Sequence, residues 1–311
     1  ARVSSLAVSA VRPPGNTLPT RDGFRVRSFV KAQEGCDDAC AYCIVPRVRG
    51  KPVSLSPEEV VRETAARAAE GYQEVVITGT KIGSYGYNGA GLTGLVESLL
   101  RQTRIPRLRL SSLQPREVTP QLLSLWNDRR LCPHFHLALQ SGSQRVLESM
   151  GRPYSIDRYR QTVSAIHSAL PYAAITTDII AGFPGETDDD FDQTYRLCRE
   201  LGFAAINVFP YSPRPSTQAA LLPGRVDERT KRQRAQAMLD LAAESREKFR
   251  QRFLGREMTV LWERETSPGV YSGLTENSIR VTVQSAERLT NRLTPTRLMS
   301  PEKGLVWVPA V

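Results

Sequence analysis

The sequence lacks any long apolar run. No hydrophobic stretch approaches the roughly 20 residues that a membrane-spanning helix needs, and the N-terminus lacks the charged-then-apolar order of a secretion signal. We therefore expect a soluble, cytoplasmic protein without a membrane partner.

Cysteine is scarce and unevenly placed. The chain of 311 residues has five cysteines, and three of them lie within positions 36–43. An odd number clustered in this way does not make a disulfide framework. The arrangement favours metal ligands in a reducing compartment.

Acidic residues are outnumbered by basic ones. The 42 Lys and Arg against 32 Asp and Glu give a formal net charge of +10. This excess favours a polyanionic partner such as nucleic acid, although many basic proteins bind none. With 40% hydrophobic residues, the chain can bury the core of one large domain and a second, smaller one.

The pattern of the chain suggests three parts. Residues 1–23 begin with Ala1 rather than Met and contain Pro and Gly, so they resemble a linker that follows a missing N-terminal domain. Residues 24–250 alternate strand and helix patterns six times and end in a long polar helix at 230–253. Strands are expected at 24–33, 74–78, 107–112, 135–139, 174–182 and 204–211. This rhythm predicts parallel strands in a partial barrel or a doubly wound sheet, since a closed barrel needs eight units.

Residues 251–311 have a different sequence pattern. Short alternating segments at 258–263, 269–276, 279–284 and 304–309 are separated by turn residues. We expect a small all-β barrel there.

Cys36, Cys40 and Cys43 follow the first expected strand in a C-x3-C-x2-C spacing. Loops at this end of parallel strands build the sites of β/α domains. A structural zinc ion would need four ligands, and bacterial ferredoxins use four cysteines in a tighter run. Three thiolates would leave one iron of a [4Fe–4S] cluster open, although a zinc half-site and an incidental grouping remain alternatives.

This spacing resembles that of the radical S-adenosylmethionine (SAM) superfamily. The resemblance implies a [4Fe–4S] cluster on the three cysteines and SAM on the open iron. It further implies that an electron from the cluster cleaves SAM to a 5′-deoxyadenosyl radical, while the protein positions the cofactor and excludes water.

Six stretches, taken in order, resemble the methylthiotransferases that modify adenosine 37 of transfer RNA. They are residues 35–50, 77–86, 108–115, 134–152, 178–191 and 209–217. The second and third are more similar to the threonylcarbamoyladenosine subfamily than to the isopentenyladenosine one. Pro213-Arg214 after Tyr211-Ser212 is similar to the members that act on RNA rather than on a ribosomal protein. The resemblance implies a partial (β/α)6 barrel that methylthiolates C2 of N6-threonylcarbamoyladenosine.

The same resemblance assigns SAM or substrate contacts. Tyr42 would pack on the adenine, and Gly79 and Thr80 would bind the methionyl ammonium. Gln140 and Ser141 would bind ribose or substrate hydroxyls, and the turn that contains Gly182 and Gly185 would contact the adenine. Without the resemblance these residues would be read as an ordinary loop aromatic, turn glycines, polar loop residues and a helix entry capped by Thr187 and Asp190.

The C-terminal barrel resembles a TRAM domain, an RNA-binding module of these enzymes. Its basic and aromatic residues would pair with phosphates and stack on bases. They are Arg264, Arg280, Arg288, Arg292, Arg297, Tyr271 and Trp307. The implied partners are the anticodon stem-loop of transfer RNA and an electron donor such as flavodoxin or ferredoxin, and we expect a monomer.

Members of this family carry an N-terminal domain with three more cysteines for a second [4Fe–4S] cluster, which is associated with the transferred sulfur. Cys132 and Cys198 cannot replace them, and we expect both to pack as small apolar groups. This chain alone should then bind its cluster and SAM and cleave SAM, without completing methylthiolation.

Other interpretations remain open at this level. His134 and His136 share a strand face and suggest a metal, but packing is the simpler interpretation. Arg47 and Arg49 could meet RNA phosphate, SAM carboxylate or only solvent. The whole chain could also be a radical SAM enzyme with another RNA or protein substrate, or a zinc-containing RNA-binding protein without catalysis.

Overall fold

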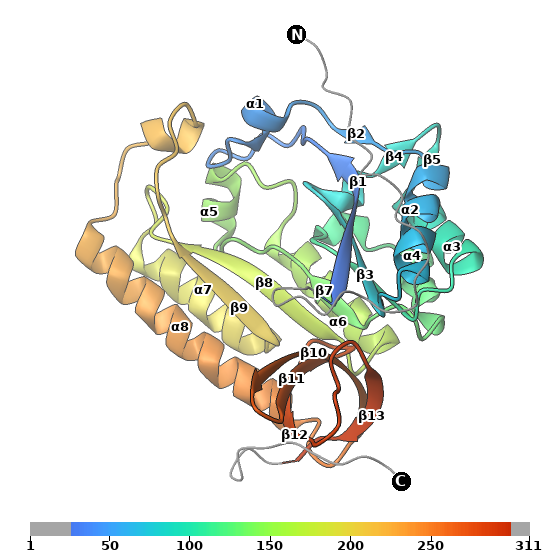
Figure 1. The fold of residues 1–311 in the computed structure, drawn as a ribbon. Coiled ribbons are helices and arrows are strands. Elements are labelled where there is room, and N and C mark those ends of the chain that lie inside the picture. The colour runs from blue at the N-terminus through green and yellow to red at the C-terminus, as the bar shows by residue number, and fades with distance from the viewer. Residues whose placement is uncertain (1–25, 300–311) are drawn as a thin grey trace.

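The computed structural model describes residues 26–299 and shows an α/β half-barrel followed by an antiparallel sheet (Figure 1). The linker expected at 1–23, the strand expected at 304–309 and Trp307 lie outside the described residues. No helix among the described residues is long and apolar enough to cross a membrane.

Six parallel strands form the half-barrel, in the order of the chain. They are β1 (Arg27–Glu34), β3 (Glu74–Gly79), β6 (Arg107–Leu110), β7 (His134–His136), β8 (Ala174–Ala181) and β9 (Ala205–Pro210). The isolated parallel bridges Leu108↔Leu131 and Leu113↔Leu137 join the β1-β3-β6 sheet to the β7-β8-β9 sheet. The expected partial barrel is therefore confirmed, and the doubly wound alternative is wrong.

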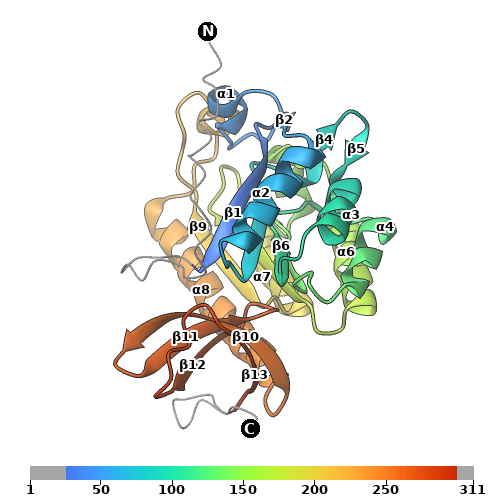
Figure 2. The same cartoon turned by 45° about the vertical axis from the view of Figure 1, so that its right-hand side comes forward.

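Helices alternate with the strands and cover their outer face. The helices are α1 (Val45–Arg49), α2 (Pro57–Ala69), α3 (Leu92–Gln102), α4 (Pro120–Ser124), α5 (Gln144–Ser149), α6 (Ile156–Ala169), α7 (Asp188–Leu201) and α8 (Glu228–Gln251). The short elements are β2 (Val53–Ser54), β4 (Gly86–Tyr87), β5 (Ala90–Gly91) and the 3-10 helices η1 (Ile82–Ser84), η2 (Pro115–Glu117), η3 (Leu125–Asn127) and η4 (Gln218–Leu221). Figure 2 shows α2 and α3 over the outer side of β1, β3 and β6.

Local sequence explains several of these boundaries. Helix α2 begins with the full capping box expected from Ser56 and Glu59. Strand β7 is shorter than the expected 135–139, because a side chain replaces part of its ladder. The Thr177 hydroxyl accepts the Leu139 N–H at 3.0 Å and donates to the Leu137 carbonyl at 2.7 Å.

The strands of the half-barrel alternate between two environments. Val30, Ile77 and Leu108 are fully buried in the core that the helices share. Their neighbours along each strand turn to the inner face, where charged and polar residues such as Glu74, Arg109 and Asp178 lie. The helix-facing side therefore supplies the apolar core, and the inner face is free for polar functions.

Residues after α8 form an antiparallel sheet that curves strongly (Figure 1). Its strands, in spatial order, are β12 (Arg280–Gln284), β11 (Val270–Thr275), β10 (Glu257–Ser267) and β13 (Leu293–Arg297). Strand β13 was not among the expected strands. Within residues 26–299 it is the outermost strand of this sheet, a position that tolerates Pro295, which has no N–H donor.

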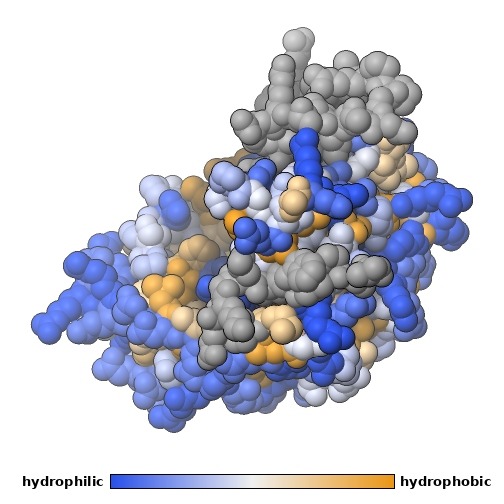
Figure 3. Space-filling view, turned by 60° about the horizontal axis from the view of Figure 1, so that its bottom comes forward, coloured by the Kyte–Doolittle hydropathy of each residue, from blue (hydrophilic) through white to orange (hydrophobic). Residues whose placement is uncertain are grey.

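The two parts meet at the end of the half-barrel opposite α1 (Figure 1). Arg107 donates to the Leu274 carbonyl at 3.1 Å, and Arg109 donates to the Ser278 hydroxyl at 2.7 Å. The Arg27 guanidinium lies 2.7 Å from the Glu263 carboxylate. The face seen from this end is mostly hydrophilic, and its apolar residues form separate patches (Figure 3).

Candidate functional site

The three clustered cysteines lie on a loop that leaves the carboxyl end of β1. Gly35 turns the chain there with a φ of +80°, and a Cβ at this position would lie 2.2 Å from the Lys51 carbonyl oxygen. The Cys36 N–H donates to the Gly50 carbonyl at 3.1 Å, which closes the loop on itself. Cys36, Cys40 and Cys43 are all half-buried and free of disulfides.

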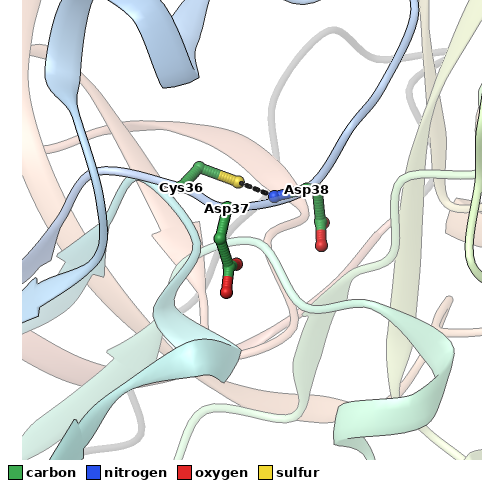
Figure 4. Close-up of side chains that lie close together, drawn as sticks. All are labelled: Cys36, Asp37 and Asp38. Atoms are coloured by element: carbon green, nitrogen blue, oxygen red, sulfur yellow. Dashed lines mark hydrogen bonds between the residues drawn. The ribbon is translucent and has the colours of Figure 1, made fainter.

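The spacing of the three sulfur atoms tests the zinc interpretation. Thiolates on one tetrahedral zinc ion lie about 3.8 Å apart, from a Zn–S distance of about 2.3 Å. Among the described residues, the group whose ligand atoms lie within 4.8 Å of one another is Cys36, Asp37 and Asp38, without the other two cysteines (Figure 4). At least one pair of the three sulfurs therefore lies more than 4.8 Å apart, wider than one tetrahedral ion requires, and a larger cluster fits the loop better.

The group of Cys36, Asp37 and Asp38 does not itself make a metal site. Asp38 already accepts hydrogen bonds from the Lys81 ammonium at 2.6 Å and the Gln114 amide at 2.7 Å. Its backbone N–H donates to the Cys36 sulfur at 3.4 Å (Figure 4). Asp38 thus ties the cysteine loop to the chain that follows β3 and β6.

Burial raises the pKa of the Cys36 and Cys43 thiols. The protein alone therefore favours the neutral thiol, and the thiolate form depends on bound metal. Three half-buried cysteines on one loop fit a [4Fe–4S] cluster with one open iron.

One residue beside the cysteines was missed by sequence reasoning. Arg152 donates to the Cys40 sulfur at 3.2 Å and to the Tyr42 hydroxyl at 3.4 Å, and its Nε donates to the Tyr154 hydroxyl at 3.0 Å. It is the last residue of the matching stretch 134–152, but nothing in the spacing placed it beside a cysteine more than 100 residues earlier. Its fixed positive charge could hold a cluster thiolate or a carboxylate of SAM.

Tyr42 lies between the cysteine loop and the turn after β8. Its half-buried ring joins a small apolar cluster with Ala41, Met150 and Phe183, so the cysteine loop lies against the turn at 182–186. Burial raises the pKa of the Tyr42 hydroxyl well above its usual range. The structure thus brings together two segments that were assigned to the adenine of SAM.

Gly79 and Thr80 lie at the carboxyl end of β3, beside β1. A Cβ on Gly79 would lie 3.0 Å from both the Cβ and the carbonyl oxygen of Gln33, so the close approach of the two strands favours glycine. The side-chain Oε1 of Gln33 accepts the Lys81 N–H at 2.9 Å. Thr80 is exposed at this rim.

Gln140 and Ser141 follow β7 at the same rim. Gln140 has a φ of +71°, an uncommon conformation for a residue with a side chain and one that is found at functional sites. The buried Ser141 hydroxyl lies 3.2 Å from the Thr194 hydroxyl and accepts the Ser143 N–H at 3.2 Å. The Ser141 side chain therefore already has partners within the protein, and its assigned ligand contact stays a prediction.

The turn after β8 is fixed from outside the half-barrel. Gly182 and Gly185 have φ values of +76° and +80°, and the Gly182 N–H donates to the Glu186 carboxylate at 2.9 Å. Arg234 of α8 donates to the same carboxylate at 2.7 Å. A Cβ on Gly182 would lie 2.0 Å from the Lys231 side chain, so α8 packs directly on this turn.

Comparison with known proteins decides the family. Residues 30–198 match the model of the radical SAM superfamily. The chain belongs to the radical SAM superfamily. This membership implies a [4Fe–4S] cluster and SAM as cofactors, and Cys36, Cys40 and Cys43 remain the predicted ligands of that cluster.

Two kinds of transfer RNA methylthiotransferase resemble this radical SAM chain. It is 38% identical over 259 residues to the threonylcarbamoyladenosine tRNA methylthiotransferase MtaB of Thermotoga maritima, covering 82% of this chain and 60% of the relative. It is 36% identical over 296 residues to the tRNA-2-methylthio-N(6)-dimethylallyladenosine synthase of Bacillus velezensis, covering 93% and 58%. The chain therefore spans about 60% of the length of these relatives.

Solved radical SAM structures share the fold. Coproporphyrinogen III oxidase HemN from Escherichia coli aligns with a TM-score of 0.55 at 16% identity, covering 73% of this chain and 54% of that one. The methyltransferase TsrM from Kitasatospora setae, with cobalamin and a [4Fe–4S] cluster bound, aligns with a TM-score of 0.54 at 17% identity, covering 62% and 38%.

The other two cysteines and the two neighbouring histidines lie away from the cysteine loop in their own surroundings. Cys132 and Cys198 are fully buried, as expected of small apolar groups. His136 lies between the Thr176 hydroxyl, 3.0 Å from Nδ1, and the Asp178 carboxylate, 3.1 Å from Nε2. His134 Nε2 lies 3.3 Å from the same Thr176 hydroxyl, so both histidines have hydrogen-bond partners within the protein.

The C-terminal sheet of the radical SAM chain modifies one expectation. Tyr271 is only 5% exposed and belongs to the core around Trp262. The prediction that its ring stacks on RNA bases is therefore wrong. An alternating strand pattern does not say which face is buried. The five basic residues assigned to RNA are exposed; Arg280 pairs with Glu263, and Arg292 pairs with Glu287 at 3.1 Å.

Proposed function

We propose that this chain is the radical SAM core of a transfer RNA methylthiotransferase that modifies C2 of N6-threonylcarbamoyladenosine at position 37. The observation that carries the proposal is the loop of Cys36, Cys40 and Cys43, which offers three half-buried thiols at the carboxyl end of β1. The 38% identity to a threonylcarbamoyladenosine enzyme supports the substrate.

The residues around the loop have separable tasks. The cluster, when bound, supplies the electron that cleaves SAM. Arg152 places a positive charge beside Cys40, and Tyr42 with Phe183 forms an apolar surface against which an adenine ring would pack. Gly79, Thr80 and Gln140 lie at the strand ends that face this loop and would bind the polar groups of SAM.

Anaerobic reconstitution tests the cluster and SAM cleavage. We expect about four iron atoms per chain and 5′-deoxyadenosine when the protein is reduced with SAM. Cys40→Ala should lose both, whereas Cys198→Ala should retain both because Cys198 is buried away from the loop. Retention of both by Cys40→Ala, or zinc without iron–sulfur absorbance, would refute the assignment.

The proposal extends to partners. The anticodon stem-loop of transfer RNA would contact the exposed Arg47 and Arg49 beside the cysteine loop and the exposed arginines of the C-terminal sheet. Flavodoxin or ferredoxin would supply the electron to a monomer. Binding of stem-loop RNA that weakens steeply with salt would support this partner. Mass spectrometry of the RNA product would test methylthiolation, which should require the longer protein.

A second substrate also deserves a test. The 36% identity to a dimethylallyladenosine enzyme over 93% of the chain supports an apolar N6 substituent instead. Binding assays with stem-loop RNAs that differ only in this substituent would separate the two candidates.

A further inference from the structure

The inner face of β1 presents two side chains to the interior of the half-barrel. Val30 and Ala32 are fully buried in the core that β1 shares with α2. Phe29 and Lys31 alternate with them and point to the opposite face. Phe29 is 48% exposed and so offers an accessible aromatic ring on this face.

Most basic side chains on this inner face already pair with acidic groups or bind the C-terminal sheet. Arg107 and Arg109 have side chains 5% exposed and bind Glu74 and the C-terminal sheet. Arg27 is 28% exposed and pairs with Glu263. Lys31, whose side chain is 45% exposed, is the most accessible of these four cations, and it lies five residues before Cys36.

An irregularity in β1 gives Lys31 its present partner. Lys31 pairs with Thr78 and Gln33 pairs with Gly79, so Ala32 is an extra residue in the ladder with β3. Bulges of this kind redirect side chains and are frequent next to active sites. Because of it, the Lys31 ammonium reaches the Glu34 carboxylate at 2.7 Å, although residues three apart in a regular strand face opposite sides.

The Glu34 carboxylate is the present hydrogen-bond partner of the Lys31 ammonium. One of its oxygens accepts from Lys31, and the other accepts from Arg49 of α1 at 2.7 Å. Both pairs are exposed, and exposed ion pairs contribute little to stability. Lys31 can therefore turn to an incoming carboxylate while Arg49 retains Glu34.

We propose that Lys31 is the specificity residue that binds the carboxylate of the N6-threonylcarbamoyl group, with Phe29 flanking the base. This rests on the proposed function and deepens it. The threonylcarbamoyl substituent carries a free carboxylate, whereas the dimethylallyl substituent is uncharged and apolar. A charge-assisted hydrogen bond from Lys31 therefore distinguishes the two substrates.

The test uses the full chain and three synthetic anticodon stem-loop RNAs. They are identical except at position 37, which carries threonylcarbamoyladenosine, dimethylallyladenosine or adenosine. We expect the unmutated protein to bind the first about tenfold more tightly than the others, as one charge-assisted hydrogen bond predicts. Lys31→Gln should abolish this preference, and Lys31→Arg should retain most of it.

Two further variants make the test specific. Lys248→Gln is the matched control, because Lys248 is also an exposed lysine that pairs with a nearby acid, Glu244 at 2.6 Å on the outer helix α8. It should leave the preference unchanged. Glu34→Gln should raise affinity for the threonylcarbamoyl RNA, since it releases Lys31, and this holds even if Lys31→Gln fails to fold.

The outcomes separate the two proposals. If the unmutated protein prefers threonylcarbamoyl RNA and Lys31→Gln keeps that preference, the role of Lys31 is refuted and the proposed function stands. Equal loss in Lys248→Gln would also refute it, because the effect would then be general charge. If the unmutated protein shows no preference for the threonylcarbamoyl RNA, both the proposed substrate and the role of Lys31 are refuted.

Discussion

The guanidinium of Arg152 donates to the sulfur of Cys40 at 3.2 Å, across 112 positions of sequence. Hydrogen bonds to cluster sulfurs stabilise the reduced, more negative state and so raise the reduction potential. Arg152→Lys keeps the charge but loses the planar fork. We expect the midpoint potential of the reconstituted cluster to fall by roughly 50 mV, as the loss of about one such hydrogen bond predicts.

Spectroelectrochemical titration under anaerobic conditions measures this potential. Arg160→Lys is the control, because Arg160 pairs with Glu200 on the outer surface at 2.8 Å. An unchanged potential in Arg152→Lys would show that Arg152 does not tune the cluster.

The stability of the cysteine loop should depend on the buried ammonium group of Lys81. The Lys81 side chain is 6% exposed and binds Asp38 at 2.6 Å. Although burial opposes it, the hydrogen bonds from Lys81 and Gln114 hold the pKa of Asp38 below its ordinary value. Lys81→Met should leave this carboxylate without its main partner and cost about 2 kcal/mol of unfolding free energy. Urea denaturation measures the loss, and a change under 0.5 kcal/mol would contradict it.

Acid should weaken the fold partly through Asp190. Burial raises the pKa of Asp190, but hydrogen bonds from Arg145, Ser143 and Thr187 outweigh it and leave the pKa well below the usual range. A depressed folded pKa means that the stabilisation is present above the unfolded value of about 3.9 and is lost as pH falls below it.

Asp190→Asn should therefore destabilise the protein at neutral pH by about 1–2 kcal/mol, mainly by weakening the α7 capping box, in which the Asp190 carboxylate accepts the Thr187 N–H at 2.8 Å. It should also flatten the pH dependence of stability below about pH 4. Urea denaturation at neutral and acidic pH measures both effects. Asp192→Asn, at an exposed position in the same helix, should reproduce neither.

The buried Glu74 should be essential for joining the half-barrel to the C-terminal sheet. Its carboxylate is fully buried and lies 2.9 Å from Arg109, which in turn binds Ser278. Glu74→Gln would leave a buried guanidinium without its counter-charge, which costs about 3 kcal/mol or more. The urea midpoint should fall accordingly, while Glu247→Gln on α8 should shift it little. Equal midpoints for the two variants would contradict this role.

RNA binding should depend unequally on the C-terminal arginines. Arg264, Arg288 and Arg297 are exposed and have no ion pair with any residue in 26–299, whereas Arg280 and Arg292 each pair with a glutamate. Gln at any of the first three should lower the salt dependence of binding by about one phosphate contact. The salt slope of stem-loop binding by fluorescence anisotropy measures this, and identical slopes for all five variants would refute the distinction.

Local patterns predicted the elements that local chemistry specifies. The capping box at Ser56 and the periodicity of 188–201 placed α2 and α7 within one or two residues. The side-chain hydrogen bonds of Thr177 that replace backbone pairing after β7 have no recognisable sequence pattern. Strand β7 was therefore expected to be two residues longer than it is. Strand β13 was also not expected, and its pairing with β10 places Pro295 opposite Thr259, which only the tertiary structure shows.

The sequence by itself determined the three cysteines, their open ligand position and the family they indicate, because ligand spacing within one loop is a local property. Only the tertiary structure decided that Arg152 meets Cys40, that Tyr42 meets Phe183, that Tyr271 is buried and that Lys31 faces the inside of the half-barrel. Each of these depends on strand register and on packing between distant segments. A shift of one residue in the pairing of a strand moves every side chain to the opposite face of the sheet. The local sequence pattern does not determine this register.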